Sequence, residues 1–404
     1  MSDSETCTVL CIASYEKGFE FMRQLKNDGC RVLLITSKSL QGVNWPRESI
    51  DEIYYMPDVD KVWNIDDLIH SVSYLARKEQ IDRIVALDDY DVEKAARLRE
   101  HLRVPGMGDT TARYFRDKLA MRLRAAEAGI QVPPFVHILN YDSIREYLFS
   151  VEPPYVLKPR MQAGAVGIKK ISNFDELWRT LDLLGDKQSY YLLEKFIPGK
   201  IHHADSIVYG KKILFAIAHE YGLPPMEVAH EGRIFSTRTM IYGSDEEQEI
   251  LAMNKKLLEA LGLVQGISHT EFIRGSEDGK LYFLETSARV GGANIANLIE
   301  QSSGINLWTE WAKIETSYLT GKYSVPKAKK EYAGLMICLA KQEHPDLSSF
   351  NDPEVVWKLD KKNHAGLIVA SKKYDSITGL LAKYSERFYS DFFTTAPMKD
   401  KASG

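Results

Sequence analysis

Residues 1–110 alternate short apolar runs with segments of helical spacing, and this alternation restricts the fold more than any other feature. Thr8–Ala13, Arg31–Ile35 and Arg83–Leu87 are apolar runs of strand length, and the intervening Tyr15–Asp28 repeats its apolar residues at helical intervals. Strands that alternate with helices form a parallel sheet covered by those helices. We therefore predict a doubly wound α/β domain. The turn Ser14–Gly18 lacks the Gly-x-Gly-x-x-Gly pattern, which argues against a dinucleotide cofactor.

Two changes of pattern divide the rest of the chain. Residues 109–129 read as a helical stretch, and strands joined by glycine-containing turns dominate from residue 155 to 290. Lys327–Lys330 is a short basic run typical of a solvated linker, and it precedes strand signals at 334–340 and 365–370 and a helix at 376–389. We predict three units, namely an N-terminal α/β domain (1–110), a central domain (111–325) and a small C-terminal α+β domain (326–404).

Composition limits the possible partners. The net charge of −4 offers no basic surplus for non-specific binding of nucleic acid. No apolar run approaches the length that spans a bilayer, and Met1–Thr6 is polar and acidic rather than basic as in a secretory signal. The four cysteines show no metal-site or disulfide spacing. We expect a cytoplasmic protein without nucleic-acid or membrane partners.

The segment Ser268–Gly292 is the most informative, because it reads as an antiparallel hairpin with opposed acidic residues. A turn centred on Asp278 places Glu271 directly opposite Glu285. Strand alternation puts five polar residues on one face: His269, Glu271, Glu285, Ser287 and Arg289. Opposed carboxylates destabilise a sheet unless a positive charge lies between them, and Mg²⁺ binds carboxylates together with phosphate oxygens. A solvated hairpin face with a cross-strand salt bridge is the alternative.

Two other segments carry weaker signals. Lys158 ends an apolar strand, where an unpaired charge is costly, and the small-residue loop Gly164–Gly167 that follows can place backbone N–H groups around phosphate. No Gly-Lys-Ser/Thr follows, so the loop is not a P-loop. Glu194 also ends an apolar strand, and such a carboxylate beside free backbone groups can read an adenine edge. Each segment alone also fits an ordinary turn or strand end.

In this order and spacing, the three segments resemble the ATP-grasp superfamily, especially its carboxylate–amine ligases and biotin-carboxylase-like members. Asp117-Lys118 and Ala128–Pro133 are similar to the family's entry element, and Gly366–Val369 with Ser376–Gly379 resembles its small closing domain. The resemblance implies an ATP-grasp fold of mixed α/β and α+β class, between the doubly wound domain and the small C-terminal domain.

The resemblance also implies roles for individual residues. ATP would be contacted by Lys118, Lys158, Gly164, Ala165, Gly167, Glu194, Lys195, Phe196, Ile197, His203, Asp205 and Leu284. Two Mg²⁺ ions, or Mn²⁺ in their place, would be bound by Glu271, Glu285 and Ser287, where Ser287 replaces the family's usual Asn. The catalytic residues would be Arg289, Lys158 and His269, and the carboxylate substrate would contact Arg289, Gly291 and Gly292.

The implied activity is that of an ATP-dependent ligase that forms a C–N bond through an acyl phosphate. His269–Phe272 and Glu285–Gly292 most resemble L-amino-acid ligases, which implies an amino-acid substrate, small-molecule carboxylate and amine partners, and a homodimer. The alternatives are a biotin-carboxylase-like or purine-pathway ligase, and a non-catalytic nucleotide-binding module, which only Ser287 favours. Specificity candidates in the 200–240 region are Tyr221, Met226, His230, Arg233 and Arg238.

Overall fold

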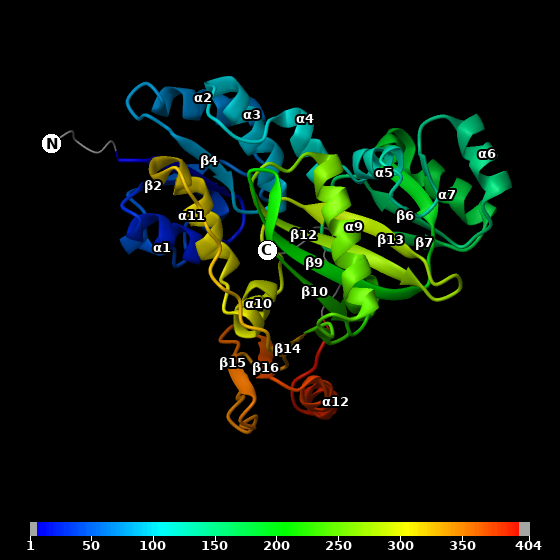
Figure 1. Ribbon diagram of the computed structural model, residues 1–404. Helices are drawn as coiled ribbons and strands as arrows, with labels where there is room; N and C mark the ends of the chain where they lie inside the picture. The colour runs from blue at the N-terminus through cyan, green and yellow to red at the C-terminus, as the bar shows by residue number, and fades with distance from the viewer. Residues whose placement is uncertain (1–5, 396–404) are drawn as a thin grey trace.

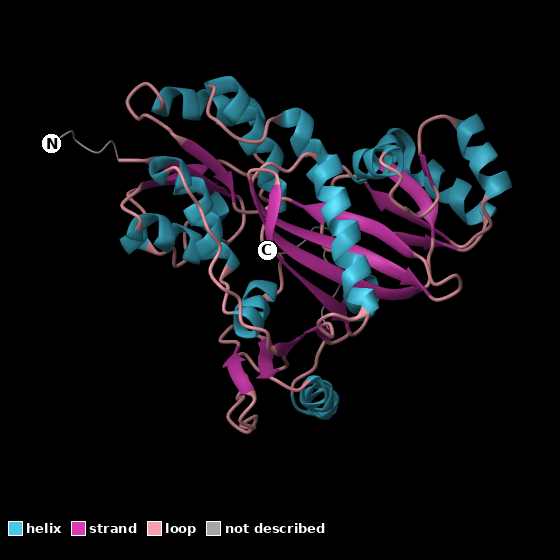
Figure 2. Ribbon diagram, viewed as in Figure 1, coloured by secondary structure: helices cyan, strands magenta, loops and turns pink. Residues whose placement is uncertain are grey.

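The computed structural model describes residues 6–395, which form three sheets (Figure 1). The first has four strands in the order β3-β2-β1-β4, the second has four in the order β5-β8-β6-β7, and the third has eight in the order β13-β12-β9-β10-β11-β14-β16-β15. Helices pack against all three sheets (Figure 2). The predicted mixture of parallel α/β and antiparallel α+β structure is confirmed. Met1–Glu5, in the polar start, lie outside the described residues.

The first sheet is parallel throughout, as predicted. Its strands are β1 (Thr8–Ala13), β2 (Arg31–Ser37), β3 (Glu52–Met56) and β4 (Arg83–Ala86). Its helices are α1 (Phe19–Asn27), α2 (Ile65–Leu75) and α3 (Val92–Leu102). Val9 faces the cluster that contains α1, whereas Leu10 faces the cluster that contains α2 and α3, so both faces are covered. The helix predicted from Tyr15 begins only at Phe19, because Gly18 takes a left-handed conformation (φ 79°) that ends the preceding turn.

The helical stretch predicted over residues 109–129 is interrupted. Helix α4 (Asp109–Ala112) ends after one turn, and α5 (Lys118–Glu127) starts anew after a 3₁₀ turn at Arg113–Phe115. Asp117 causes the restart, because its side chain accepts a hydrogen bond from the backbone N–H of Leu119 (2.9 Å) and so caps α5.

The second sheet is antiparallel and carries its helices on one face. Its strands are β5 (Phe135–His137), β6 (Tyr155–Pro159), β7 (Lys169–Ile171) and β8 (Tyr191–Lys195), and its helices are α6 (Tyr141–Ser150) and α7 (Phe174–Leu184). Leu157 and Leu193 pack beneath Ile144 of α6 and Leu177 of α7. The opposite face of this sheet is therefore left to line a cavity.

The third sheet is the largest body of the molecule. Its strands are β9 (Gly199–Tyr209), β10 (Lys212–Tyr221), β11 (Phe235–Thr239), β12 (Gly266–Gly275), β13 (Leu281–Ser287), β14 (Tyr332–Leu339), β15 (Val355–Lys358) and β16 (His364–Ser371). Its helices are α8 (Pro225–Glu231), α9 (Asp245–Leu261), α10 (Ile295–Ser303), α11 (Leu307–Thr320) and α12 (Tyr374–Asp391). Figure 1 shows α9 lying across one face of β9, β10 and β12, where Leu257 packs on Ala204 and Phe272.

The predicted unit boundaries fall at two different kinds of place. Residue 110 lies within α4, and residue 325 lies in the link between α11 and β14. The sheet itself continues across that link, because β11 pairs with β14 from Phe235↔Ile337 to Arg238↔Gly334. The division into three units remains a prediction. Within residues 6–395, no helix combines the length and apolarity needed to cross a membrane.

Gly199→Ala should destabilise the protein by roughly 1–3 kcal/mol, the usual cost of overpacking. A Cβ at position 199 would lie 2.0 Å from the carbonyl oxygen of Arg274 on the paired strand, and this oxygen belongs to the backbone. Urea unfolding measures the effect, with Gly42→Ala as control because a Cβ there meets nothing within 4 Å. Equal midpoints for the two variants would contradict the close approach.

Candidate active site

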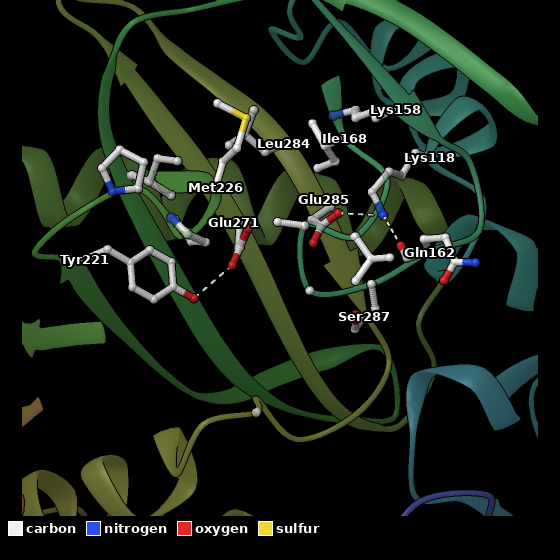
Figure 3. Close-up of a pocket in the computed structure, with 18 of the residues that line it drawn as sticks. Lys118, Lys158, Gln162, Ile168, Tyr221, Met226, Glu271, Leu284, Glu285 and Ser287 are labelled. Atoms are coloured by element: carbon white, nitrogen blue, oxygen red, sulfur yellow. Dashed lines mark hydrogen bonds and ion pairs between the residues drawn. The ribbon is translucent and has the colours of Figure 1, made fainter. Parts of the chain in front are cut away.

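A cavity of about 560 Å³ opens between the second and third sheets and extends to the first. The second sheet contributes β6, β8 and the loop between β6 and β7, and the third contributes β10, β12 and β13. Residues after β1 and β4 of the first sheet form a further wall. Figure 3 shows Glu271, Glu285 and Ser287 on neighbouring strands, with Lys118 and Lys158 across from them. One cavity thus gathers carboxylates and ammonium groups from distant parts of the chain.

The two glutamates face each other, as the hairpin register predicted. Glu271 pairs directly with Glu285, but beyond this pair the ladder shifts by one residue, so that Phe272 pairs with Phe283. Leu284 is the extra residue of the resulting β-bulge. The bulge explains why Leu284 lines the cavity beside Glu285, although simple alternation would point it the other way.

Lys118 provides a positive charge for the opposed glutamates. Its Nζ lies 2.8 Å from Glu285 Oε2 and donates to the carbonyl oxygen of Gln162 at 2.6 Å (Figure 3). Burial disfavours the charged form of Glu285, but the Lys118 ammonium outweighs it and lowers the pKa of Glu285 below its usual value. Glu285 is therefore an anion at neutral pH.

Glu271 belongs to a chain of buried polar groups. Its Oε1 accepts a hydrogen bond from the Tyr221 hydroxyl at 2.8 Å and lies 3.6 Å from His269 Nε2. The other nitrogen of His269, Nδ1, lies 2.9 Å from Asp205 Oδ1, and Asp205 Oδ2 lies 2.7 Å from His203 Nδ1. Burial alone would lower the pKa of His269, but the Asp205 carboxylate raises it to about 10. His269 is thus a hydrogen-bond donor at neutral pH, not a free base.

Glu194 holds two buried cations. Lys158 Nζ contacts Glu194 Oε1, and Arg122 Nη2 lies 3.0 Å from Glu194 Oε2. Burial lowers the pKa of Lys158 to about 8, although Glu194 opposes this shift. The ion pair with Glu194 offsets the desolvation cost of burying the Lys158 ammonium at the end of an apolar strand. Arg122, which sequence reasoning missed, lies inside α5 with no motif to mark it.

The wall formed by the first sheet was also missed. Arg289 Nε donates to Asp89 Oδ2 at 2.8 Å, and Arg289 Nη2 contacts the same oxygen. Burial opposes ionisation of Asp89, but the Arg289 guanidinium holds the pKa of that carboxyl well below its usual range. Asp89 lies three residues beyond the end of β4, and the acidic run Asp88–Asp91 behind an apolar strand was the signal that could have revealed it.

The structure brings together most of the predicted site residues. The predicted residues that line the cavity are Lys118, Lys158, Gly164, Ala165, Glu194, Lys195, Phe196, Ile197, His269, Glu271, Leu284, Glu285, Ser287, Arg289 and Gly292. Tyr221 and Met226 line it as well, whereas Arg233 pairs with Glu231 and Arg238 with Glu220 outside it. The side chain of His230 lies outside the described residues.

Four predicted residues lie behind the cavity wall instead of on it. His203 and Asp205 are fully buried and lie behind the cavity-lining His269 and Tyr221, which they contact. Gly291 packs against the same network, since a Cβ there would lie 3.0 Å from His269 Nδ1. Gly167, the last residue of the loop, packs against β6, where a Cβ would lie 2.9 Å from Pro159 Cγ.

Opposed carboxylates, two lysines and an arginine lie between two antiparallel sheets, a donor set that suits a phosphorylated ligand with a hard cation. Residues 151–297 match the ATP-grasp domain. The chain therefore carries an ATP-grasp domain over these residues, as its sequence indicated.

Known proteins agree with this assignment. An L-arginine-specific L-amino acid ligase from Bacillus subtilis is 26% identical over 267 residues, which cover 64% of this chain and 62% of that relative. The matched segment thus spans less than two thirds of the relative. The structure of an L-amino acid ligase from Bacillus licheniformis has a TM-score of 0.75 at 16% identity and covers 96% of this chain and 99% of its own. N5-carboxyaminoimidazole synthetase from Staphylococcus aureus, complexed with ADP, has a TM-score of 0.71 at 17% identity, covering 94% and 97%.

Proposed function

We propose that this protein is an ATP-dependent ligase that joins a carboxylate to an amine through an acyl phosphate, with an amino acid as a substrate. The supporting observation is the facing pair Glu271 and Glu285 in one cavity with Lys118, Lys158 and Arg289. Carboxylates on one side and cations on the other suit a nucleotide whose phosphates carry a metal ion. The relative from Bacillus subtilis, an L-amino acid ligase by name, supports the choice of an amino acid.

The donor set fits a hard divalent cation. Glu271 and Glu285 offer oxygen ligands of the kind that Mg²⁺ and Mn²⁺ prefer, and Ser287 adds a hydroxyl on the same face. Two Mg²⁺ ions, with Mn²⁺ as a substitute, are the cofactors that we propose for these residues. When bound, such ions neutralise phosphate oxygens and orient them. Tyr221 fixes the Glu271 carboxylate by its hydrogen bond, which holds one ligand in place.

The remaining wall residues have distinct proposed tasks. Lys118 and Lys158 would bind the phosphates of ATP, and the backbone of residues 195–197 beside Glu194 would bind its base. Arg289 would hold the substrate carboxylate, whose oxygen attacks the γ-phosphorus while ADP leaves. The amine nitrogen then attacks the acyl carbon, the C–O bond to phosphate breaks, and the amine's protons pass to phosphate and solvent. The loop at 164–167 would exclude water from the acyl phosphate.

Phosphate release from ATP tests the proposal directly. Purified protein with Mg²⁺ is incubated with single L-amino acids and with pairs, and products are weighed by mass spectrometry. We expect ADP and phosphate together with a product equal in mass to the two substrates minus water. Release supported by bicarbonate, or by a purine precursor alone, would reassign the acid. ATP binding with no release across the whole panel would overturn the ligase proposal.

Binding of ADP should weaken at alkaline pH. The pKa of Lys158 lies at about 8, so its ammonium, which attracts phosphate, is lost as pH rises from 7 to 9. The dissociation constant should increase by roughly tenfold over that interval, as expected for one required proton. Calorimetric titration measures the dissociation constant at each pH. The constant should still rise with pH in Lys212→Met, a control at an exposed lysine, and should no longer depend on pH in Lys158→Met. A flat profile for the unaltered protein would contradict the assignment.

We propose a cytoplasmic homodimer that acts on small molecules, as carboxylate–amine ligases of this superfamily suggest. Sedimentation equilibrium measures the mass of the purified protein in solution. A single species at the chain mass of 45.9 kDa would contradict the dimer.

A further inference from the structure

The wall of the cavity formed by the first sheet lies where such a sheet commonly binds ligands. The chain runs from β1 outward to β3 and then returns to β4 on the other side of β1, so the strand order reverses between β1 and β4. Ligands of open parallel sheets bind outside the carboxyl ends of strands at this reversal. Tyr15 and Lys17 follow β1 there, Asp88–Tyr90 follow β4, and all of them line the cavity.

Asp89 presents a poorly satisfied hydrogen-bond acceptor at this place. Its side chain is only 5% exposed, and Arg289 engages Oδ2 alone. Oδ1 is buried without a hydrogen bond of normal geometry among the described residues, although the nearby Ser287 hydroxyl helps to stabilise the carboxylate. A buried carboxylate oxygen without a donor is costly, and a cationic N–H group from a ligand would relieve that cost.

The same wall carries a positive group and two aromatic rings. Lys17 Nζ pairs with Asp88 Oδ2 and keeps 26% of its side chain exposed. Tyr15 precedes Lys17 in the chain and Tyr90 follows Asp89; the centroids of their rings lie 5.3 Å apart, and both residues line the cavity. An anionic acceptor and a partly exposed ammonium on one wall match the two charges of a zwitterion.

We propose that Asp89 Oδ1 binds the ammonium group of an incoming amino acid and that Lys17 binds its carboxylate. The bound ammonium loses one proton to solvent, and the resulting amine is the nucleophile of the ligation. This inference rests on the proposed ligase function. The nucleotide, metal and acid groups are all assigned to residues outside the first sheet and the loops that follow its strands, so this wall is the one left for the amine. Arg289 joins the two halves, because it contacts Asp89 and is assigned to the acyl group.

Asp89 could bind the amino acid nucleophile or could only position Arg289. Replacing the amino acid nucleophile by hydroxylamine distinguishes these two roles. Hydroxylamine is small and uncharged near neutral pH, so it traps the acyl phosphate without needing an ammonium site. In Asp89→Asn, the ratio of peptide formation to hydroxamate formation should fall by about 100-fold, as for a site that loses one charged hydrogen bond. Asp66→Asn, an exposed aspartate of the same domain, should leave the ratio as it is.

Other outcomes would overturn the assignment. Equal loss of peptide and hydroxamate would show that Asp89 acts only through Arg289. A raised KM for the acid substrate with an unchanged ratio of products would show that Asp89 binds the amino acid that supplies the carboxylate. Should Asp89→Asn not fold, Lys17→Met provides a second test. It should reduce the preference for amino acids over their carboxamides by about tenfold, and an unchanged preference would refute the zwitterion site. Absence of both products in the unaltered protein would instead refute the ligase function itself.

Discussion

Glu285→Ala should reduce amino-acid-dependent ADP formation by at least about 10²–10³-fold, the loss seen when one group that stabilises developing charge is removed. The fold should survive, because the change relieves the opposition of Glu285 and Glu271, and Lys118 keeps its hydrogen bond to the Gln162 carbonyl. Initial rates with Mg²⁺ and the thermal unfolding midpoint measure the two effects together.

A matched variant in the same hairpin controls for charge. Glu277 lies exposed in the turn between β12 and β13, far from the paired glutamates along the ladder. Glu277→Ala should retain activity and midpoint. Full activity in Glu285→Ala would refute the metal assignment, whereas a collapsed midpoint would show that Glu285 is needed for folding.

Glu194→Gln should lower the free energy of unfolding by about 3–5 kcal/mol, the cost of breaking a buried ion pair. The change leaves Arg122 and Lys158 without their shared carboxylate, and their side chains are only 0% and 7% exposed. Urea unfolding measures the loss, and Glu146→Gln on the exposed side of α6 is the control, with an expected effect near zero.

The penalty in Glu194→Gln should depend on pH in a definite direction. Burial already sets the pKa of Lys158 at about 8, and the loss of Glu194 removes the main influence that raises it. Above its lowered pKa in the folded variant, Lys158 is deprotonated and neutral. In the unfolded chain, Lys158 stays protonated up to its ordinary, higher pKa. Stability of the variant should therefore recover between pH 7 and 9. A constant penalty over this interval would contradict the buried charge of Lys158.

The parts of this molecule that local sequence determines were predictable. A tight turn and strand alternation fix which residues of a hairpin face each other, and so Glu271 opposite Glu285 followed from the chain alone. The bulge at Leu284 did not, because no residue type marks where a ladder gains an extra residue. Similarly, the apolar runs located the strands of the first sheet, whereas α3 went unnoticed behind its many charged residues.

Contacts between distant segments were beyond sequence reasoning. Asp89 and Arg289 are 200 residues apart, and Arg122 and Glu194 are 72 apart, so their pairing depends on how the three sheets assemble. The family resemblance identified the charged groups but not their partners. For that reason the site was predicted as separate ligands, whereas the structure holds these groups in ion pairs.

The unbroken ladder from β11 to β14 also decides which parts of this protein are interchangeable. A chimaera cut at residue 325 would strip β11 of its neighbour and leave an edge that invites aggregation. The sheet formed by β5 to β8 is different, since the chain enters it before Phe135 and leaves it after Lys195, at two points that flank one body. In chimaeras with related proteins, this four-stranded sheet should therefore be exchangeable as one unit. The eight-stranded sheet should have to come from a single parent.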